Sequence, residues 1–439
     1  MNTEYTKIII AVIGTGTAAF HQTLKLSQEL NFEYFELDWI YDPETPIFGI
    51  GEATTPHIPS LLRRSKFTTD LIMNQLKGSF KYGVRFFNWG KKNKKFTHDF
   101  GTGSYGIHMD TSALSEFTVK HIDKLKGTNI KVIPEKVETI ESLPSGCVVN
   151  GRNYNFVIDC SGNEPLLYKE EYIDSEFPTV DSAVIYRRKT PGTWNHTVHF
   201  AHEHGWMFGI PLKDRQTWGY TFSSKFTTEE EAREGLQKLI PNEDVSMARY
   251  ITWKPRFASF LIDDNGVYAR NGNAAGFMEP LQSLSGLHTD QVSKILTDYV
   301  NDDASKQEAN TAIIDSEKEW LEGLAYHYQM GSAFDSPFWN DVSDRAKKFL
   351  EDKKCSESDI QDIYNENPTD VERVELGCFE IIDLVQLSRG LDTPTADIFD
   401  QWKFADIDEA NSFWGTQNSI EAVSYTHLRA HETPEHLVW

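Results

Sequence analysis

The sequence predicts an α/β fold organised around a dinucleotide-binding unit near its N-terminus. Residues 8–13 form a continuous apolar run rich in β-branched side chains, which is typical of a strand buried on both faces. Gly14, Gly16 and Ala19 follow this run at the spacing Gly-x-Gly-x-x-Ala. The next segment, 15–29, predicts a helix. A strand, a glycine-rich turn and a helix in this order favour a dinucleotide site.

Each small residue of this turn has a physical role. Gly14 permits a tight turn, Gly16 lets a pyrophosphate approach the backbone, and Ala19 lets the helix pack closely on the strand. Thr17 and Ala18 lie at the N-terminus of the predicted helix, where free backbone N–H groups attract an anion. The alternative is a structural glycine turn in another kind of α/β protein.

A second strand is predicted over residues 35–41, and Asp42 stands at its end. In a dinucleotide-binding fold, an acidic residue at this place accepts hydrogen bonds from a ribose. Asp42 is therefore the predicted ribose ligand. The alternative is an ordinary aspartate that opens the proline-containing turn 42–46.

Length and charge limit the class of protein. The 439 residues are enough for one large α/β domain with an appended part, or for two domains. The net charge of −23 argues against nucleic acid or an anionic membrane as the main partner, because either needs a basic surface. The sequence shows no apolar run of membrane-spanning length and no signal-peptide pattern, so a cytoplasmic protein is expected.

Cysteines and histidines give no metal signature. The cysteines at positions 147, 160, 355 and 378 have no Cys-x-x-Cys spacing, which fits a reducing compartment. The region 181–224 is strand-rich and alternating, as in an antiparallel sheet, and it holds His196, His199, His202 and His204. The uneven spacing of these histidines predicts positions on the surface of the sheet.

Two further strands bear on the predicted site. Residues 79–89 alternate loosely and predict a strand on which Lys81 stands among apolar neighbours. From the residues alone, the plain interpretation of Lys81 is a solvated charge at a sheet edge. Residues 154–162 predict a return strand that carries Asp159 and Gly162 toward the cofactor.

The second half of the sequence begins with a short predicted strand at 267–270. The small residues within 271–287 suit close backbone approach to a ligand, and a helix is predicted over 288–302. From residue 305 to about 413 the sequence is helical and more polar.

The end of the chain, 423–439, has no periodicity and resembles translated adapter read-through, so it is excluded from the fold. The expected organisation is therefore one large domain of discontinuous lobes at 1–304, a C-terminal helical region at 305–422 and a non-native tail at 423–439.

Four stretches, taken in order, resemble those of the flavin-dependent tryptophan halogenases, which are two-component FAD halogenases. They are 13–19 (Ile-Gly-Thr-Gly-Thr-Ala-Ala), 49–56 (Gly-Ile-Gly-Glu-Ala-Thr-Thr-Pro), 205–211 (Gly-Trp-Met-Phe-Gly-Ile-Pro) and 272–281 (Gly-Asn-Ala-Ala-Gly-Phe-Met-Glu-Pro-Leu). Residues 326–328 and 335–339 resemble the family's C-terminal helical region. The resemblance covers about residues 7–415. It implies a Rossmann-like FAD-binding domain of the flavin monooxygenase type, with an antiparallel substrate sheet and a C-terminal helical region.

The resemblance also implies a set of site residues. FAD would contact Gly14, Gly16, Thr17, Ala18, Ala19, Asp42, Gly51, Glu52, Ala53, Asp159, Gly162, Gly272, Asn273 and Gly286. The aromatic substrate would contact Trp206, Phe208, Gln282 and Ser283. A halide would bind the backbone amides of Leu284 and Ser285, and no metal is expected.

Members of this family use reduced FAD, dioxygen and a halide to make hypohalous acid. This species passes through a tunnel to a lysine, which directs it onto an electron-rich aromatic carbon. Lys81 matches the position of the family lysine, and the match reverses the plain interpretation of Lys81 as a surface charge. An ammonium group polarises hypohalous acid through a hydrogen bond, whereas a neutral amine forms a haloamine. Burial would favour the neutral amine by lowering its pKa.

Three positions depart from the family pattern. Phe208 replaces the second tryptophan of Trp-x-Trp-x-Ile-Pro, a motif associated with blocking a monooxygenase-type reaction. Gln282 replaces a glutamate that acts as a base or stabilises the cationic ring intermediate. Asn273 replaces an aspartate near the flavin phosphates. With Gln282, the expected substrate is a ring more activated than that of free tryptophan.

The leading interpretation is an FADH2-dependent halogenase of an indole or phenol-like substrate. It would depend on a separate NAD(P)H-dependent flavin reductase, because no nicotinamide site is visible. One alternative is a flavin-dependent aromatic monooxygenase of the same fold. It stays possible because Phe208 and Gln282 depart from the halogenase pattern. Another is an inactive flavin-binding relative. The oligomeric state is open, a homodimer included.

Overall fold

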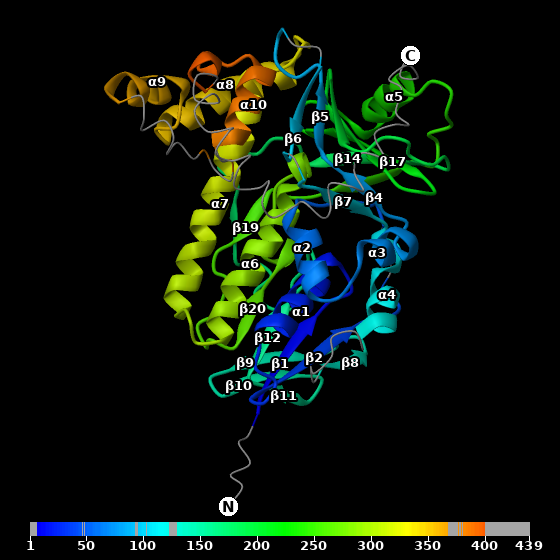
Figure 1. Cartoon of the computed structure of the whole chain (residues 1–439), viewed down its shortest axis with the longest axis vertical. Helices are drawn as coiled ribbons and strands as arrows, with labels where there is room; N and C mark the ends of the chain where they lie inside the picture. The colour runs from blue at the N-terminus through cyan, green and yellow to red at the C-terminus, as the bar shows by residue number, and fades with distance from the viewer. Residues whose placement is uncertain are drawn as a thin grey trace, which may run out of the picture.

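The computed structural model of the chain describes residues 7–45, 47, 49–92, 95–101, 103–122, 130–367, 376, 379 and 381–399. In Figure 1, a parallel sheet occupies the lower part of the molecule, and a larger sheet lies above it. Helices α6 (Leu284–Val300) and α7 (Lys306–Tyr328) run side by side next to the parallel sheet. The tail predicted at 423–439 lies outside the described residues.

The five-stranded parallel sheet has the order β20-β12-β1-β2-β8. Its strands are β1 (Ile8–Ile13), β2 (Phe35–Tyr41), β8 (Ile130–Pro134), β12 (Phe156–Asp159) and β20 (Tyr268–Arg270). The strands predicted at 8–13 and 35–41 are confirmed residue for residue. Helix α1 (Thr17–Glu29) follows β1 as predicted and begins two residues later than expected. Because the strands are parallel, the loops after β1, β12 and β20 meet at one edge.

The seven-stranded sheet has the order β18-β14-β17-β16-β15-β5-β6. Its strands are β5 (Gly83–Phe87), β6 (Lys95–Asp99), β14 (Ser182–Arg188), β15 (Thr197–His202), β16 (Gly205–Pro211), β17 (Gln216–Phe222) and β18 (Arg249–Thr252). All neighbouring pairs are antiparallel except β15 and β5, so the antiparallel sheet predicted for 181–224 is confirmed. Helix α5 (Glu229–Leu239) packs on β14 and β17.

The surface position predicted for the four histidines of this sheet is wrong for three of them. His196, His199 and His202 are buried, because both faces of the sheet are covered at their positions, and only His204 is partly exposed. Within the described ranges, no group of three or more His, Cys, Asp or Glu residues is arranged to hold a metal ion.

Three small sheets complete the strands. They are β3 (Glu52–Ala53), β7 (Gly106–Met109) and β4 (Ser79–Lys81); β9 (Ile140–Leu143), β10 (Gly146–Val149) and β11 (Arg152–Tyr154); and β13 (Tyr172–Asp174), β19 (Arg256–Ala258) and β21 (Gly276–Phe277). The single strand predicted at 79–89 is therefore two strands, β4 and β5, in different sheets. The chain crosses between them at Gly83, where a Cβ would stand 2.2 Å from the carbonyl oxygen of His98. Only glycine permits this close approach.

The remaining helices are α2 (His57–Arg64), α3 (Thr69–Gln75), α4 (Leu114–His121), α8 (Pro337–Asp352), α9 (Glu357–Glu366) and α10 (Ile381–Leu391). A 3₁₀ turn, Thr111–Ala113, precedes α4 directly. Helix α6 begins at Leu284, four residues before its predicted start. No helix of the described residues is long and apolar enough to cross a membrane.

The largest hydrophobic core joins the seven-stranded sheet to the C-terminal helices. Trp89, Trp206 and Trp339 are fully buried in it, and the rings of Trp89 and Trp339 meet edge-to-face at 5.1 Å. This aromatic packing fixes the C-terminal helices against the sheet. Leu281 and Leu284 belong to the same core, which therefore also holds the loop before α6.

Candidate active site

The glycine-rich turn after β1 lies at the edge of the parallel sheet where the loops converge. Gly14 has φ +147°, and a Cβ there would stand 2.5 Å from the carbonyl oxygen of Cys160. The indole N–H of Trp39 donates to the Gly14 carbonyl over 2.9 Å. Only glycine fits this position, as expected for the tight turn.

Open space lies over the same edge. A Cβ on Gly16, Gly162 or Gly286 would meet no heavy atom within 4 Å. Gly272 has φ +61°, and a Cβ there would stand 2.4 Å from the Cβ of Ala18, so its loop touches the first turn of α1. The backbone at this edge can therefore be approached closely by an anionic ligand at the N-terminus of α1. These residues fit the pyrophosphate of a dinucleotide.

The predicted flavin residues 51–53 are joined to this turn. The hydroxyl of Thr17 donates to the Glu52 carboxylate over 2.9 Å. Gly51 has φ +101°, and Ala53 pairs with His108 on β7. The structure thus brings a stretch from the third strand to the N-terminus of α1, although 35 residues separate Thr17 from Glu52 in the sequence.

Asp42 and Asn273 both lie near the surface. The Asp42 carboxylate accepts hydrogen bonds from the Glu44 backbone N–H over 2.9 Å and from the Thr45 hydroxyl over 2.8 Å. The Thr45 hydrogen bond is the main reason that the pKa of Asp42 is lowered. Asn273 is exposed in the 3₁₀ turn Gly272–Ala274. Asp42 thus organises its own turn, and a ribose contact stays a prediction.

Asp159 is fully buried at the end of β12. Its carboxylate accepts hydrogen bonds from the backbone N–H groups of Ser161 (2.8 Å) and Leu166 (2.6 Å) and from the Tyr268 hydroxyl (2.5 Å). These bonds fix the loop that contains Gly162. Asp159 therefore shapes the edge of the predicted cofactor site by holding its backbone.

Lys81 is completely buried at the end of β4. Its ammonium nitrogen Nζ lies 2.8 Å from Oγ of Ser283 and 5.1 Å from the centre of the Phe100 ring. Burial lowers the pKa of Lys81 from 10.5 to about 7. The plain interpretation of Lys81 as a solvated edge charge is therefore wrong, because the side chain is buried against Phe100 and the loop before α6.

Two buried histidines, His108 and His199, lie near Lys81, and a third, His327, lies near His199. His108 bonds Ser79 and Thr197, whereas Nδ1 of His199 has no hydrogen-bond partner among the described residues. Burial lowers the pKa of His108 and His199 well below 6.5, and the charge of Lys81 lowers both further. Burial also lowers the pKa of His327 to about 4. The wall around Lys81 is thus polar and uncharged.

The loop before α6 has an unusual backbone. Gln282 (φ 56°) and Ser283 (φ 64°) are consecutive non-glycine residues in the left-handed region, at a cost of roughly 1–3 kcal/mol each. This conformation turns Ser283 toward Lys81 and places Leu284 and Ser285 at the start of α6. The Leu284 N–H donates to the Leu281 carbonyl, so one of the two predicted halide amides is already hydrogen-bonded.

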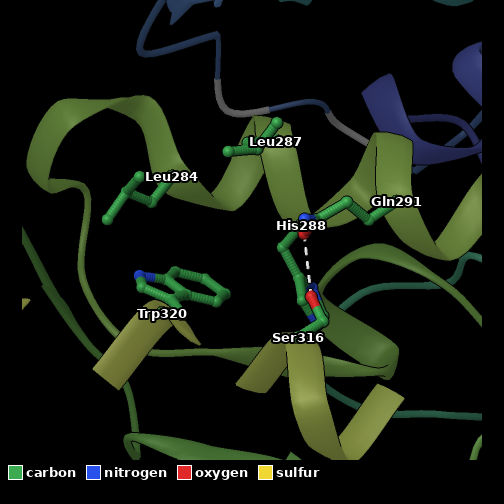
Figure 2. A pocket seen from close by; sticks show the side chains of 6 residues that line it. All are labelled: Leu284, Leu287, His288, Gln291, Ser316 and Trp320. Atoms are coloured by element: carbon green, nitrogen blue, oxygen red, sulfur yellow. Dashed lines mark hydrogen bonds between the residues drawn. The ribbon is translucent and has the colours of Figure 1, made fainter. Parts of the chain in front are cut away.

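A small cavity of about 10 Å³ lies between α6 and α7, next to the predicted halide residues. Figure 2 shows the side chains that line it, Leu284, Leu287, His288, Gln291, Ser316 and Trp320. Burial lowers the pKa of His288 to about 4, and its Nε2 has no partner among the described residues. The pocket is far too small for a flavin ring or an aromatic substrate.

Two aromatic residues that were predicted to contact the substrate are packed in the core. Trp206 and Phe208 lie on β16, and the Phe208 ring covers Gly219 on β17, where a Cβ would stand 2.1 Å from it. The Trp206 indole N–H donates to the Tyr328 hydroxyl over 2.9 Å, and that hydroxyl donates to Glu279 over 3.1 Å. Glu279 is buried, and burial raises its pKa to about 7.

Sequence reasoning missed several residues of this region. The structure adds His98, His327 and Asp383 beside Gln282, and Tyr328 and Glu279 behind Trp206. Glu279 and Tyr328 lie within stretches that resemble the family, so the resemblance could have identified them. For His98 and Asp383, which are 285 residues apart, no spacing in the sequence gives a signal.

The chain is similar to known proteins over most of its length. The model of the family described as "Tryptophan halogenase" matches residues 9–133 and 104–357. The tryptophan 7-halogenase RebH of Lentzea aerocolonigenes is 22% identical over 93% of this chain and 87% of its own length. The tryptophan 6-halogenase ThaL of Streptomyces albogriseolus is 23% identical over 75% of this chain and 78% of its own length.

Solved structures show the same fold. The tryptophan halogenase from Shewanella frigidimarina NCIMB 400 superposes with a TM-score of 0.74, covering 94% of this chain and 95% of that chain at 18% identity. BrvH, a flavin-dependent halogenase from Brevundimonas sp. BAL3, superposes with a TM-score of 0.71 over 89% of this chain and 92% of that chain, also at 18% identity.

Proposed function

We infer that this chain, which belongs to the tryptophan halogenase family of flavin-dependent enzymes, places a halogen on an electron-rich aromatic ring. The observation that carries the proposal is the buried Lys81, with its pKa lowered to about 7 and its Nζ 2.8 Å from Ser283. A lysine in this state is both a hydrogen-bond donor and a nucleophilic amine near neutral pH. Those are the two properties that delivery of an electrophilic halogen requires.

FAD would be held at the edge of the parallel sheet. The pyrophosphate would lie over Gly14 to Ala19, close to Gly162 and Gly272, with Asp42 toward the ribose. When bound in its reduced form, FAD supplies hypohalous acid from dioxygen and a halide. The reduced form would come from a separate flavin reductase. The halide would be held near Ser285, in the first turn of α6.

Lys81 would then direct the halogen onto the substrate. In its charged form it donates a hydrogen bond to hypohalous acid, and Ser283 holds the ammonium in place through its own hydroxyl. The ring carbon forms the new carbon–halogen bond while the oxygen–halogen bond breaks. The ring proton and the released hydroxide leave as water, so the sum is ArH + HOX → ArX + H2O. The neutral, buried histidines around Lys81 add no competing charge.

A product assay tests the proposal. The protein would be incubated with FAD, a flavin reductase, NADH, oxygen and a panel of indoles and phenols, with chloride, with bromide and without halide. We expect a product in which one ring hydrogen is replaced by the halogen supplied, and no product without halide. A hydroxylated ring formed equally in all three conditions would show an aromatic monooxygenase instead.

A further inference from the structure

Gln282 lies between two buried imidazoles. Its side-chain amide nitrogen Nε2 is 3.0 Å from Nδ1 of His98 and 3.1 Å from Nε2 of His327. All three side chains are buried. An amide group has two N–H donors on its nitrogen, so one nitrogen satisfies two acceptors at once.

The far side of each imidazole decides which nitrogen carries its proton. Nδ1 of His327 lies 2.7 Å from the Gly323 carbonyl, which only accepts, so Nδ1 is the donor and Nε2 is a free acceptor. Nε2 of His98 lies 2.8 Å from the carboxylate of Asp383, so this nitrogen is the donor and Nδ1 accepts. Both imidazoles therefore offer lone pairs to position 282. Only the NH2 side of an amide matches them.

The surroundings of Lys81 lack a compensating negative charge. Desolvation is the cause of its lowered pKa, and no carboxylate of the described residues lies close enough to oppose it. The titratable groups that face the two imidazoles are His199, Asp99 and Asp383, besides the imidazoles themselves. A positively charged ring intermediate would therefore find no anion at position 282.

We propose that His98 and His327 are positioning residues that hold a neutral amide at position 282 and exclude a carboxylate there. We propose further that the enzyme therefore halogenates rings whose own nitrogen or oxygen lone pair carries the positive charge of the intermediate. Phenols and the pyrrole ring of indoles are such substrates, with attack at C3 in indole. The part on the histidines stands on geometry alone, and the part on the substrate rests on the proposed function.

A carboxylate at position 282 would disturb both imidazoles. Its oxygens only accept hydrogen bonds, so they would face two lone pairs. To donate instead, His327 would have to give up the Gly323 bond, and His98 would have to gain a second proton or give up Asp383. Gln282→Glu is therefore expected to lower the melting temperature by several degrees and to change the protonation of both imidazoles.

Gln75→Glu is the matched control. Gln75 also faces a histidine, but through its oxygen, which accepts from Nε2 of His121 over 2.8 Å at the exposed end of α3. A carboxylate keeps that bond, so the melting temperature should stay close to that of the wild type. An equal loss in both variants would show that added charge alone is responsible, and it would overturn the proposal.

The direct experiment is ¹⁵N NMR of histidine-labelled protein, which distinguishes the two neutral tautomers and the charged form. We expect His98 with its proton on Nε2 and His327 with its proton on Nδ1, both altered in Gln282→Glu. The opposite tautomer at either residue in the wild type would overturn the positioning role. This measurement needs no substrate, so its result is independent of whether the protein proves to be a halogenase.

The substrate part is tested with indole as the probe, under the conditions of the product assay and with bromide. We expect 3-bromoindole in the wild type and a large loss of it in Lys81→Met, which excludes free hypobromous acid as its source. Bromination of the six-membered ring would overturn the substrate assignment. Expected tautomers together with no brominated product from any compound of the panel would leave the histidine part intact and refute the proposed function.

Discussion

The ammonium nitrogen of Lys81 lies 2.8 Å from the hydroxyl oxygen of Ser283, although 202 residues separate the two in the sequence. Lys81 ends β4 in a three-stranded sheet, and Ser283 precedes α6 in a strained loop. The contact therefore joins the sheet β3-β7-β4 to the loop that precedes α6.

Gly16→Val should abolish the retention of FAD while leaving the protein folded. The backbone of Gly16 is extended (φ −93°), and a Cβ there meets no protein atom within 4 Å, so valine fits the protein and intrudes only on a ligand. Flavin binding followed by fluorescence quenching, together with the melting temperature, checks this. Gly14→Val is the contrasting variant: it should unfold the protein, because its Cβ meets the Cys160 backbone. Normal flavin affinity in Gly16→Val would contradict the assignment of this edge.

Lys81→Met should change how stability depends on pH. The pKa of Lys81 is about 7 in the folded protein and about 10.4 in an unfolded chain, so between these values the unfolded state binds more protons. The cost of burying the ammonium is therefore complete below about pH 7 and is relieved as the pH rises toward about 10. Melting temperatures of both proteins across this range should show the advantage of Lys81→Met shrinking with rising pH. A constant difference would mean that Lys81 has an ordinary pKa.

Glu279→Gln should remove a pH dependence of stability whose sign is opposite to that caused by Lys81. Burial raises the pKa of Glu279 from 4.5 to about 7, so between these values the folded state binds more protons. The wild type should lose stability relative to Glu279→Gln as the pH rises through this window. Exposed Glu234 on α5 gives the control variant Glu234→Gln. Parallel melting curves for wild type and Glu279→Gln at all pH values would contradict the burial of a protonated carboxyl group.

Phe208→Ala should destabilise the protein by about 3–5 kcal/mol, because it leaves a cavity over Gly219 in the largest core. Urea unfolding measures this loss. If the ring also shields the flavin from a monooxygenase-type reaction, the variant should form more hydroxylated product per FADH2 consumed. A variant of wild-type stability would show that the ring is not packed as described.

Much of the fold follows from local pattern. The buried strands 8–13 and 35–41 and the glycine turn between the first strand and α1 are set by residues close in sequence, so their bounds are predicted well. The strand at 79–89 is predicted as one, because the close approach of Gly83 to His98 is a tertiary fact. The start of α6 is missed for a related reason. Gln282 and Ser283 adopt a left-handed backbone just before the helix, and neither is a glycine, so the sequence gives no sign of this turn.

The residues of the site also fall into those that the sequence identifies and those that only tertiary contacts bring together. Lys81 is found through its resemblance to a family lysine, while its own neighbours in the sequence suggest an exposed edge charge. Its burial depends on segments from β4, β7 and the loop before α6, which only the folded chain brings together. His98 and His327, the partners of Gln282, and Asp383, the partner of His98, are missed because they come from three distant elements.

The central claim is that Lys81 delivers the halogen, and one measurement tests it most directly. Wild type and Lys81→Ala would each be mixed with FADH2, oxygen, bromide and indole. In the same reaction, flavin oxidation would be measured by absorbance and the brominated product by mass spectrometry. In Lys81→Ala we expect flavin oxidation to continue while brominated product is lost, since oxygen reacts at the flavin. A guanidinium keeps the charged hydrogen-bond donor but does not deprotonate to form a haloamine, so product restored in Lys81→Arg would show delivery through the hydrogen bond, and product still lost would show delivery through a haloamine. Bromination by Lys81→Ala at the wild-type rate and at the same ring position would contradict the account.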